Sequence, residues 1–287
     1  MQEKTSQEIE QSTDSWLGEA GETEDKSFVP SDQVTLPVGV IKDGQNYRNL
    51  VIDEMSGIDD HLVSGKKSGN NGAKALSLVI CRSTQEVEGL LPRKQDSEKL
   101  FDREFARRMT QPDRDYLITR IFMLSGNNHA IMAGRCPRCG DVWEESVLLS
   151  DLPVVSWPED KPRELDFELE VGFKEMKNGK AVFHKKGKIR FPTGKEQELT
   201  GQMDDQASIM DAMIAACVTK VGTLEHIDQE QAKRLKRRDR ELLMSVIQNE
   251  LPGLKQWKDV RCNCGNTLQI TLDLASFFGG RRRRMKK

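Results

Sequence analysis

The sequence predicts an α+β protein made of two homologous, mainly helical modules with short β-hairpins, joined by a shared, zinc-ribbon-like site of four cysteines. Three observations support this prediction: landmarks that recur in the same order in both halves, apolar residues at helical spacing, and two close cysteine pairs. The predicted modules span residues 34–152 and 188–278, with an insert at 153–187 that is rich in Pro, Lys and Glu. An acidic arm (1–33) precedes them, and a basic tail (279–287) follows.

The internal repeat is the most informative pattern in the chain. Five landmarks recur in order: Leu36–Gly39 with Phe191–Gly194, Ser56–Asp60 with Thr200–Asp205, Cys81 with Cys217, Asp113-Arg114 with Asp239-Arg240, and Cys136–Gly140 with Cys262–Gly265. The interval of 23 residues from Asp113 to Cys136 is repeated from Asp239 to Cys262. Chance rarely preserves both an order and an interval, so the pattern predicts a duplication.

Local patterns predict the elements of each module. Pro and Gly in the Leu36–Gly39 segment favour a tight turn in a short hairpin. Ser56 and Thr200 are suited to cap the next helix, and the acidic pair behind each suits the positive end of the helix dipole. Helical spacing then predicts two buried stripes: Ile209, Met213, Ala216 and Cys217, and Leu242, Leu243, Val246 and Ile247. Strict alternation from Leu268 to Leu274 predicts a half-buried strand.

The four paired cysteines predict a metal site. Cys136 and Cys139 stand at i and i+3, and Cys262 and Cys264 form a second, shorter pair. Together they supply the four thiolates that structural Zn²⁺ takes in a tetrahedron, and a duplication explains how pairs so distant in sequence could face each other. Four protein ligands leave no position for water, so metal catalysis is not expected. An iron–sulfur cluster and a redox dithiol are the alternatives, and His129 is interpreted as an ordinary histidine.

The remaining features define classes of protein that the sequence disfavours. Cys81 and Cys217 are expected to be small buried hydrophobes rather than reactive thiols. The sequence contains no phosphate loop, nucleophile elbow or zinc-protease motif, and its four histidines are scattered, so no enzyme is predicted. It contains no apolar run of membrane-spanning length and no signal peptide, which predicts a cytosolic protein.

Both ends of the chain are strongly charged. From Glu3 to Lys26 there are eight acidic residues and two lysines, a composition typical of disorder. The tail carries Arg281, Arg282, Arg283 and Arg284, which could be a solvated end or a contact for nucleic acid. The net charge of −2 weighs against the second interpretation, because nucleic-acid binders usually present a strongly basic face.

Together these motifs resemble those of the baseplate hub and tail assembly proteins of contractile phages of the T-even type. The resemblance rests on the Leu-Pro-x-Gly strand, the Ser/Thr-Gly helix entry, the mid-module cysteine, the Asp-Arg helix and the terminal cysteine knuckle, and it covers about 36–152 and 190–278. It implies a structural or assembly role in a phage tail baseplate or a related contractile injection system. Its partners would be hub, tube or spike proteins, in the cytoplasm of the bacterial host during assembly or in the virion. The alternative is a zinc-ribbon protein that binds nucleic acid through its tail and through Lys233–Arg240.

Overall fold

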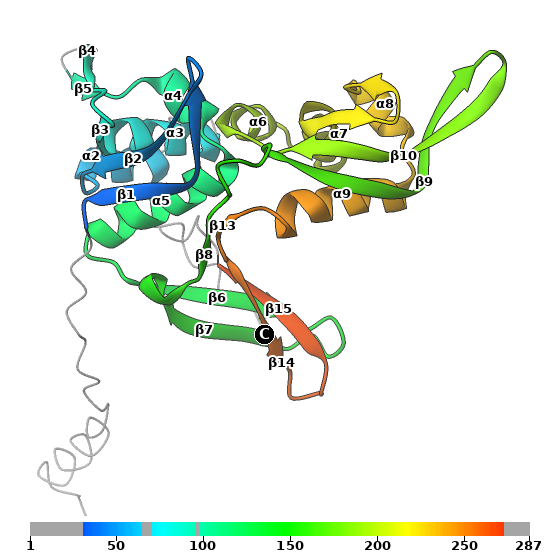
Figure 1. Cartoon of the computed structure of the whole chain (residues 1–287). Helices are drawn as coiled ribbons and strands as arrows, with labels where there is room; N and C mark the ends of the chain where they lie inside the picture. The colour runs from blue at the N-terminus through cyan, green and yellow to red at the C-terminus, as the bar shows by residue number, and fades with distance from the viewer. Residues whose placement is uncertain (1–30, 65–70, 96–97, 273–287) are drawn as a thin grey trace, which may run out of the picture. The chain divides into compact units, whose positions relative to one another are not determined.

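The structure, a computed structural model, describes residues 31–64, 71–95 and 98–272 (Figure 1). Strands, all in antiparallel sheets, account for 38% of these residues and helices for 34%. The α+β class therefore holds, but the prediction of mainly helical modules is wrong. Much of the unpredicted strand content lies in the segment predicted to be an insert. The long strands there carry charged residues on their solvent-facing sides, which gives the segment the composition of a linker.

The first half begins with a β-hairpin that packs against helices. Its elements are β1 (Gln33–Lys42), β2 (Gln45–Ile52), α2 (Gly57–Ser64), α3 (Gly72–Ser83), β3 (Thr84–Val87), β4 (Arg93–Gln95), β5 (Glu98–Leu100), α4 (Arg103–Arg108) and α5 (Gln111–Leu124). Strands β1, β2 and β3 form one sheet in that order, and α5 lies against β1. Thr110 caps α5, whose first turn contains Pro112, a residue that fits there because it needs no hydrogen-bonded N–H.

The second half repeats this order with a longer hairpin. Its elements are β9 (Glu164–Lys177), β10 (Lys180–Arg190), α6 (Gly194–Thr200), α7 (Gln206–Cys217), β11 (Val218–Val221), β12 (Leu224–Glu225), α8 (Gln229–Arg234) and α9 (Arg237–Asn249). The sheet order is β12-β11-β10-β9. The two stripes predicted from helical spacing face its core, with Met213, Cys217, Leu243 and Ile247 buried.

A four-stranded sheet combines one hairpin from each half. The first hairpin is β6 (His129–Arg135) with β7 (Val142–Leu148), and the second is β14 (Trp257–Arg261) with β15 (Thr267–Leu272). The order β14-β15-β6-β7 places the two hairpins side by side through β15 and β6. Short elements connect this sheet to the rest: the 3-10 turn Leu149–Asp151, β8 (Val154–Val155) and β13 (Gly253–Leu254), of which the last two pair with each other. The predicted alternation is confirmed as far as Leu272.

The described residues form two apolar cores, and these cores do not follow the division into modules predicted from the sequence. One contains buried residues of the first half, from Val34 to Leu149, together with Leu268, Ile270 and Leu272 of β15. The other contains residues of the second half between Phe167 and Ile247. The hairpin β14–β15 thus packs on the first core although it ends the second half of the sequence.

Equivalent contacts recur in both halves. The Asn71 side chain accepts a hydrogen bond from the third amide of α3, and Asp205 does the same in α7. The Ser56 N–H and hydroxyl both donate to Asp59, as those of Thr193 both donate to Glu196. Ser56 therefore corresponds to Thr193, and the prediction that Thr200 caps a helix is wrong because Thr200 ends α6.

Candidate metal centre

The four paired cysteines meet at one point of the shared sheet. The Sγ atoms of Cys136 and Cys264 lie 3.7 Å apart, those of Cys139 and Cys262 lie 3.5 Å apart, and all four fall within 4.8 Å of one another. Zn–S bonds of about 2.3 Å in a tetrahedron require sulfurs about 3.8 Å apart. Disulfides, by contrast, need a separation of about 2.05 Å. The donor set and its spacing therefore fit a tetrahedral metal ion.

The backbone shapes both knuckles in the same way. The Cys136 N–H donates to the carbonyl of Asp141 and the Cys262 N–H to that of Asn266, each at 2.8 Å, so both loops close next to their first sulfur. The glycine after the last cysteine of each knuckle has a positive φ, +78° and +83°, which a residue with a side chain rarely adopts. Each knuckle therefore turns back at its glycine.

The environment of Cys136 favours a thiolate, whereas desolvation and hydrogen bonds with the neighbouring thiols raise the pKa of Cys139 and Cys264. Cys136 and Cys262 are buried, whereas Cys139 is exposed. Hydrogen bonds from the backbone N–H groups of Cys139 and, after it, Arg138 lower the pKa of the Cys136 thiol to about 6. A thiolate is the form that binds metal, so this shift assists binding at neutral pH.

Other residues singled out from the sequence lie elsewhere. His129 is exposed at the start of β6 and does not belong to the cysteine cluster. Cys81 and Cys217 are buried, as predicted, and burial raises the pKa of each thiol to about 12. Arg281 to Arg284 lie outside the described residues.

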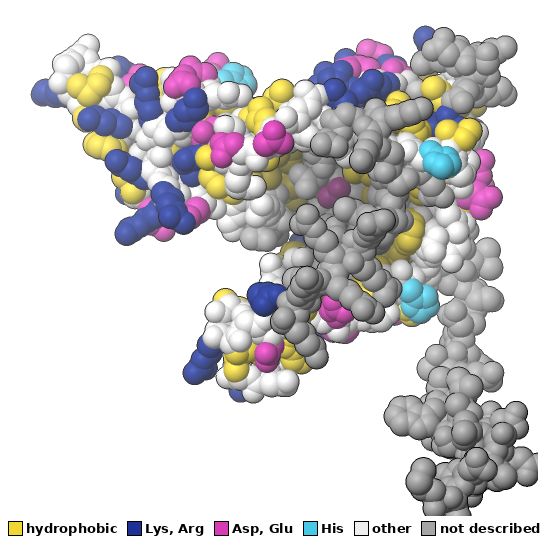
Figure 2. All heavy atoms as spheres, turned by 180° about the vertical axis from the view of Figure 1, so that it is seen from behind, with side chains coloured by type: hydrophobic (Ala, Val, Ile, Leu, Met, Phe, Trp, Pro, Cys, Tyr) yellow, Lys and Arg dark blue, Asp and Glu magenta, His cyan; other side chains and the backbone are white. Residues whose placement is uncertain are grey.

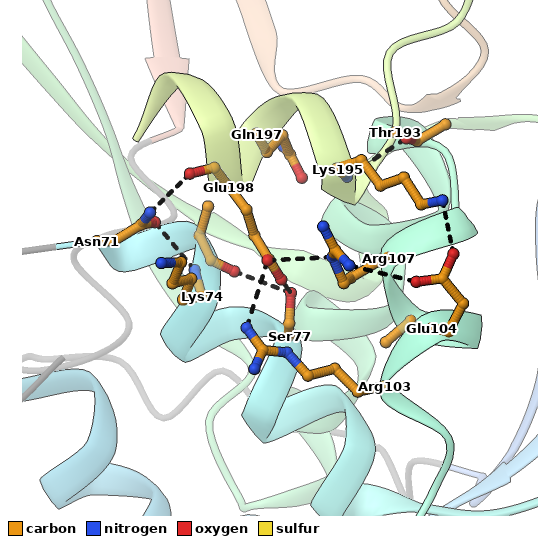
Figure 3. Close-up of polar contacts among 12 residues, drawn as sticks. Asn71, Lys74, Ser77, Arg103, Glu104, Arg107, Thr193, Lys195, Gln197 and Glu198 are labelled. Atoms are coloured by element: carbon orange, nitrogen blue, oxygen red, sulfur yellow. Dashed lines mark hydrogen bonds and ion pairs between the residues drawn. The ribbon is translucent and has the colours of Figure 1, made fainter. Parts of the chain in front are cut away.

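A second cluster of polar residues lies where the two halves of the chain meet, and we call it the joint (Figure 3). The sequence patterns do not reveal it. Glu198 of α6 is 4% exposed and accepts a hydrogen bond of 2.6 Å from the Ser77 hydroxyl of α3. Its other carboxylate oxygen lies 3.3 Å from the guanidinium of Arg103 and 3.2 Å from that of Arg107, both on α4. The Asn71 amide donates to the Glu198 carbonyl at 2.7 Å. A single side chain of the second half thus holds two helices of the first.

Arg114 also belongs to this joint. It is 2% exposed, and its guanidinium donates to the Gln197 side chain and to the carbonyls of Ala73 and Ala106. Arg114 is therefore a buried residue of the joint rather than a surface cation. Its counterpart Arg240 lies 2.5 Å from a carboxylate oxygen of the buried Asp211.

The aspartates of the two Asp-Arg pairs each fix a hairpin. The Asp113 carboxylate accepts hydrogen bonds from the amides of Val38 and Gly39 in β1. The Asp239 carboxylate accepts three, from the amides of residues 170, 171 and 172 in β9. The bend in β1 at Leu36–Gly39 thus corresponds to the bend in β9 at Leu169–Gly172, not to Phe191–Gly194.

The comparison with known families decides the classification. The model of a family described as T4 bacteriophage base plate protein matches residues 94–279. The chain belongs to this family. The matched region of this base plate protein includes both cysteine pairs, the joint residue Glu198 and the long hairpin β9–β10. No curated protein and no solved structure matches the chain. Within the described residues, no helix of this base plate protein is long and apolar enough to cross a membrane.

Proposed function

We propose that this base plate protein is a non-enzymatic structural or assembly component of a contractile phage tail or a related injection system, stabilised by one structural Zn²⁺. The observation that carries the proposal is the family match, which spans both cysteine pairs of the metal centre. Cys136, Cys139, Cys262 and Cys264 would hold the ion, and four protein ligands leave no open position for a substrate. The protein would act through contacts with hub, tube or spike proteins, in the host cytoplasm during assembly or in the virion.

We also infer that the chain contains two copies of one module. The repeated caps, the aspartates that bind a bent strand and the paired knuckles support a duplication. In the proposed division, the first module covers 34–152 and the second ends at 278. The contacts of Asp239 favour assigning the hairpin β9–β10 to the second module, so that the insert between the modules would be shorter than residues 153–187.

The alternative of nucleic-acid binding receives less support from the described residues. Four cations of the basic segment 233–240 form ion pairs with carboxylates: Lys233 with Glu230, Arg237 with Glu241, Arg238 with Glu170, and Arg240 with Asp211. Cations paired in this way offer less free charge to phosphates, and the Arg281–Arg284 tail lies outside the described residues. We therefore favour the role in the baseplate.

Metal analysis and complementation test the two parts of the proposal separately. Purified protein should contain one Zn²⁺ per chain by elemental mass spectrometry. The Cys136→Ser/Cys262→Ser variant should lose that metal, whereas the matched Cys81→Ser variant should retain it because Cys81 does not belong to the group of four cysteines that could hold the ion. Stoichiometric iron, or no metal, would contradict the zinc site. Complete baseplates from a phage that lacks this gene would contradict the role in assembly.

A further inference from the structure

The long hairpin of the second half extends beyond what its fold uses. After the bend at Gly172, residues 173–184 of β9 and β10 pair with each other from Phe173↔His184 to Lys177↔Lys180. We call this part the distal arm. Strand β11 pairs with β10 only beyond it, at residues 187–189, and the arm stands clear of the other labelled elements (Figure 1). Neither edge of the arm is paired with another strand among the described residues.

The corresponding hairpin of the first half is shorter. Beyond its bend, β1 and β2 pair only from Val40↔Tyr47 to Lys42↔Gln45. Three pairs suffice to close that hairpin, whereas the distal arm has five. The two extra pairs of the distal arm are therefore not needed to close a hairpin of this kind. We infer that they serve a function.

One face of the distal arm is exposed and carries apolar side chains beside Lys174. Cross-strand pairing of Met176 with Ala181 and of Lys174 with Phe183 places the side chains of Met176, Ala181 and Phe183 on the same face. Met176 is 62% exposed and Phe183 53%. Single exposed apolar residues are ordinary, but two large ones side by side on a projecting arm are typical of a docking surface.

The opposite face, which carries Glu175, Val182 and His184, is anchored at its base. There His184 lies 2.7 Å from the Glu175 carboxylate, and its ring packs against the backbone of Gly222 beside β11. The base of the arm is thus fixed to the sheet, which leaves the Met176 and Phe183 face directed away from these anchors. A fixed base reduces the entropy that the arm would lose on binding.

The arm is also basic, in a chain whose net charge is −2. Residues 173–184 contain three lysines and one glutamate, a net charge of +2. Figure 2 shows Lys and Arg side chains together with hydrophobic ones on this projection. The lysines also protect the unpaired strand edges from unwanted pairing with other strands, which leaves the apolar face as the surface available to a partner.

We propose that the distal arm docks by its Met176–Phe183 face into an apolar socket with an acidic rim on another tail protein. This inference rests on the proposed role in the baseplate and names the chemistry of one partner. Charge complementarity selects an acidic surface. The apolar face selects a protein rather than a nucleic acid, because phosphates would satisfy the lysines and leave the exposed Met and Phe without a partner.

Site-specific photo-crosslinking tests the proposal in the full chain. A photoreactive benzoyl-phenylalanine replaces Phe183 in protein that complements a phage lacking the gene, and crosslinked peptides are identified by mass spectrometry. The matched control carries the same group at Leu91, which is 67% exposed and lies outside the arm. Position 183 should crosslink to one tail protein, at a segment with several Asp or Glu beside apolar residues, and position 91 should not.

Charge reversal provides a second test of the proposal. Lys174→Glu/Lys177→Glu/Lys180→Glu should reduce the crosslink at 183 at least tenfold, whereas the equal change Lys233→Glu/Lys236→Glu/Arg237→Glu should leave it within twofold. The proposal is overturned if the crosslinks fall on nucleic acid, lipid or a second copy of this chain, or if both charge reversals act equally. Complete baseplates from a phage that lacks the gene would instead refute the role in the baseplate. A requirement for the gene without a crosslink at 183 would refute the arm alone.

Discussion

Removal of the Asp239 carboxylate should both destabilise the second half and loosen the bend from which the distal arm emerges. Asp239 is fully buried, and its oxygens accept hydrogen bonds of 2.7, 3.1 and 2.9 Å from the amides of Glu170, Val171 and Gly172. An Asp239→Ala variant leaves three donors without an acceptor. Gly172 is buried, whereas Glu170 is exposed, so water can replace only part of the loss.

The magnitude follows from the burial of each donor. An unsatisfied buried donor costs about 1–3 kcal/mol, and amides that reach water cost about 1 kcal/mol or less, so Asp239→Ala should lower the free energy of unfolding by about 1–5 kcal/mol. Asp239→Asn should cost about half as much, because its amide keeps one acceptor oxygen. The matched variant Asp113→Ala removes the equivalent bonds to Val38 and Gly39 in the first half.

Urea unfolding of the metal-loaded protein measures the global effect, and hydrogen exchange of residues 170–172 measures the local one. In Asp239→Ala the exchange of the Gly172 amide should accelerate at least tenfold, while that of Gly39 should remain at the wild-type rate. Asp113→Ala should show the reverse pattern. A loss below about 1 kcal/mol, below the range expected for three unsatisfied amides, together with unchanged exchange at Gly172, would refute this account of the bend.

Three further predictions concern the joint, the thiols and the shared sheet. Glu198→Ala should lower the free energy of unfolding by about 2–4 kcal/mol because it leaves Ser77, Arg103 and Arg107 without their shared acceptor; an effect no larger than that of the exposed Glu230→Ala would contradict this. Because burial raises the pKa of Cys81 and Cys217 to about 12, little thiolate forms at pH 8, and iodoacetamide should leave both unmodified in the native protein. If mass spectrometry found either thiol alkylated before unfolding, the conclusion that both thiols are buried and protonated would be wrong. In Gly134→Ala, the new Cβ would lie 2.6 Å from the Gln269 carbonyl oxygen, so β6 and β15 must separate. A chromogenic chelator should then remove zinc at least tenfold faster, and a wild-type rate would exclude such strain.

The features predictable from the sequence are those that depend on local spacing. The alternation in β15 and the cysteine knuckles each involve a few adjacent residues, so periodicity and ligand spacing reveal them. The joint could not be found in this way, because Ser77, Arg103 and Glu198 meet only through the tertiary fold. A buried carboxylate and an exposed one look alike in a sequence.

The alignment of the proposed repeat that the sequence suggests differs from the one that the contacts suggest, for a physical reason. Leu36–Gly39 resembles Phe191–Gly194 through a shared Pro and Gly, yet the shared function is the hydrogen bonding of a bent strand to a buried aspartate, which Leu169–Gly172 performs. That segment repeats the Leu, Val and Gly of the first copy without its Pro. Similarly, α3 ends at Ser83 and α7 at Cys217, so Cys81 and Cys217 occupy different positions in their helices.

The division of the cores predicts how loss of the proposed Zn²⁺ would affect the contact between β15 and the first half. Leu268, Ile270 and Leu272 are buried in the first core, and burial of each such side chain contributes about 1.5–3 kcal/mol. That apolar contact should keep β15 on the first half after the zinc is removed. Chelation should therefore release residues 262–266 locally without separating the halves. Hydrogen exchange should show faster exchange at 262–266 and continued protection at 268–272. Loss of protection over both ranges would instead show that the metal, rather than the apolar core, holds this hairpin to the first half.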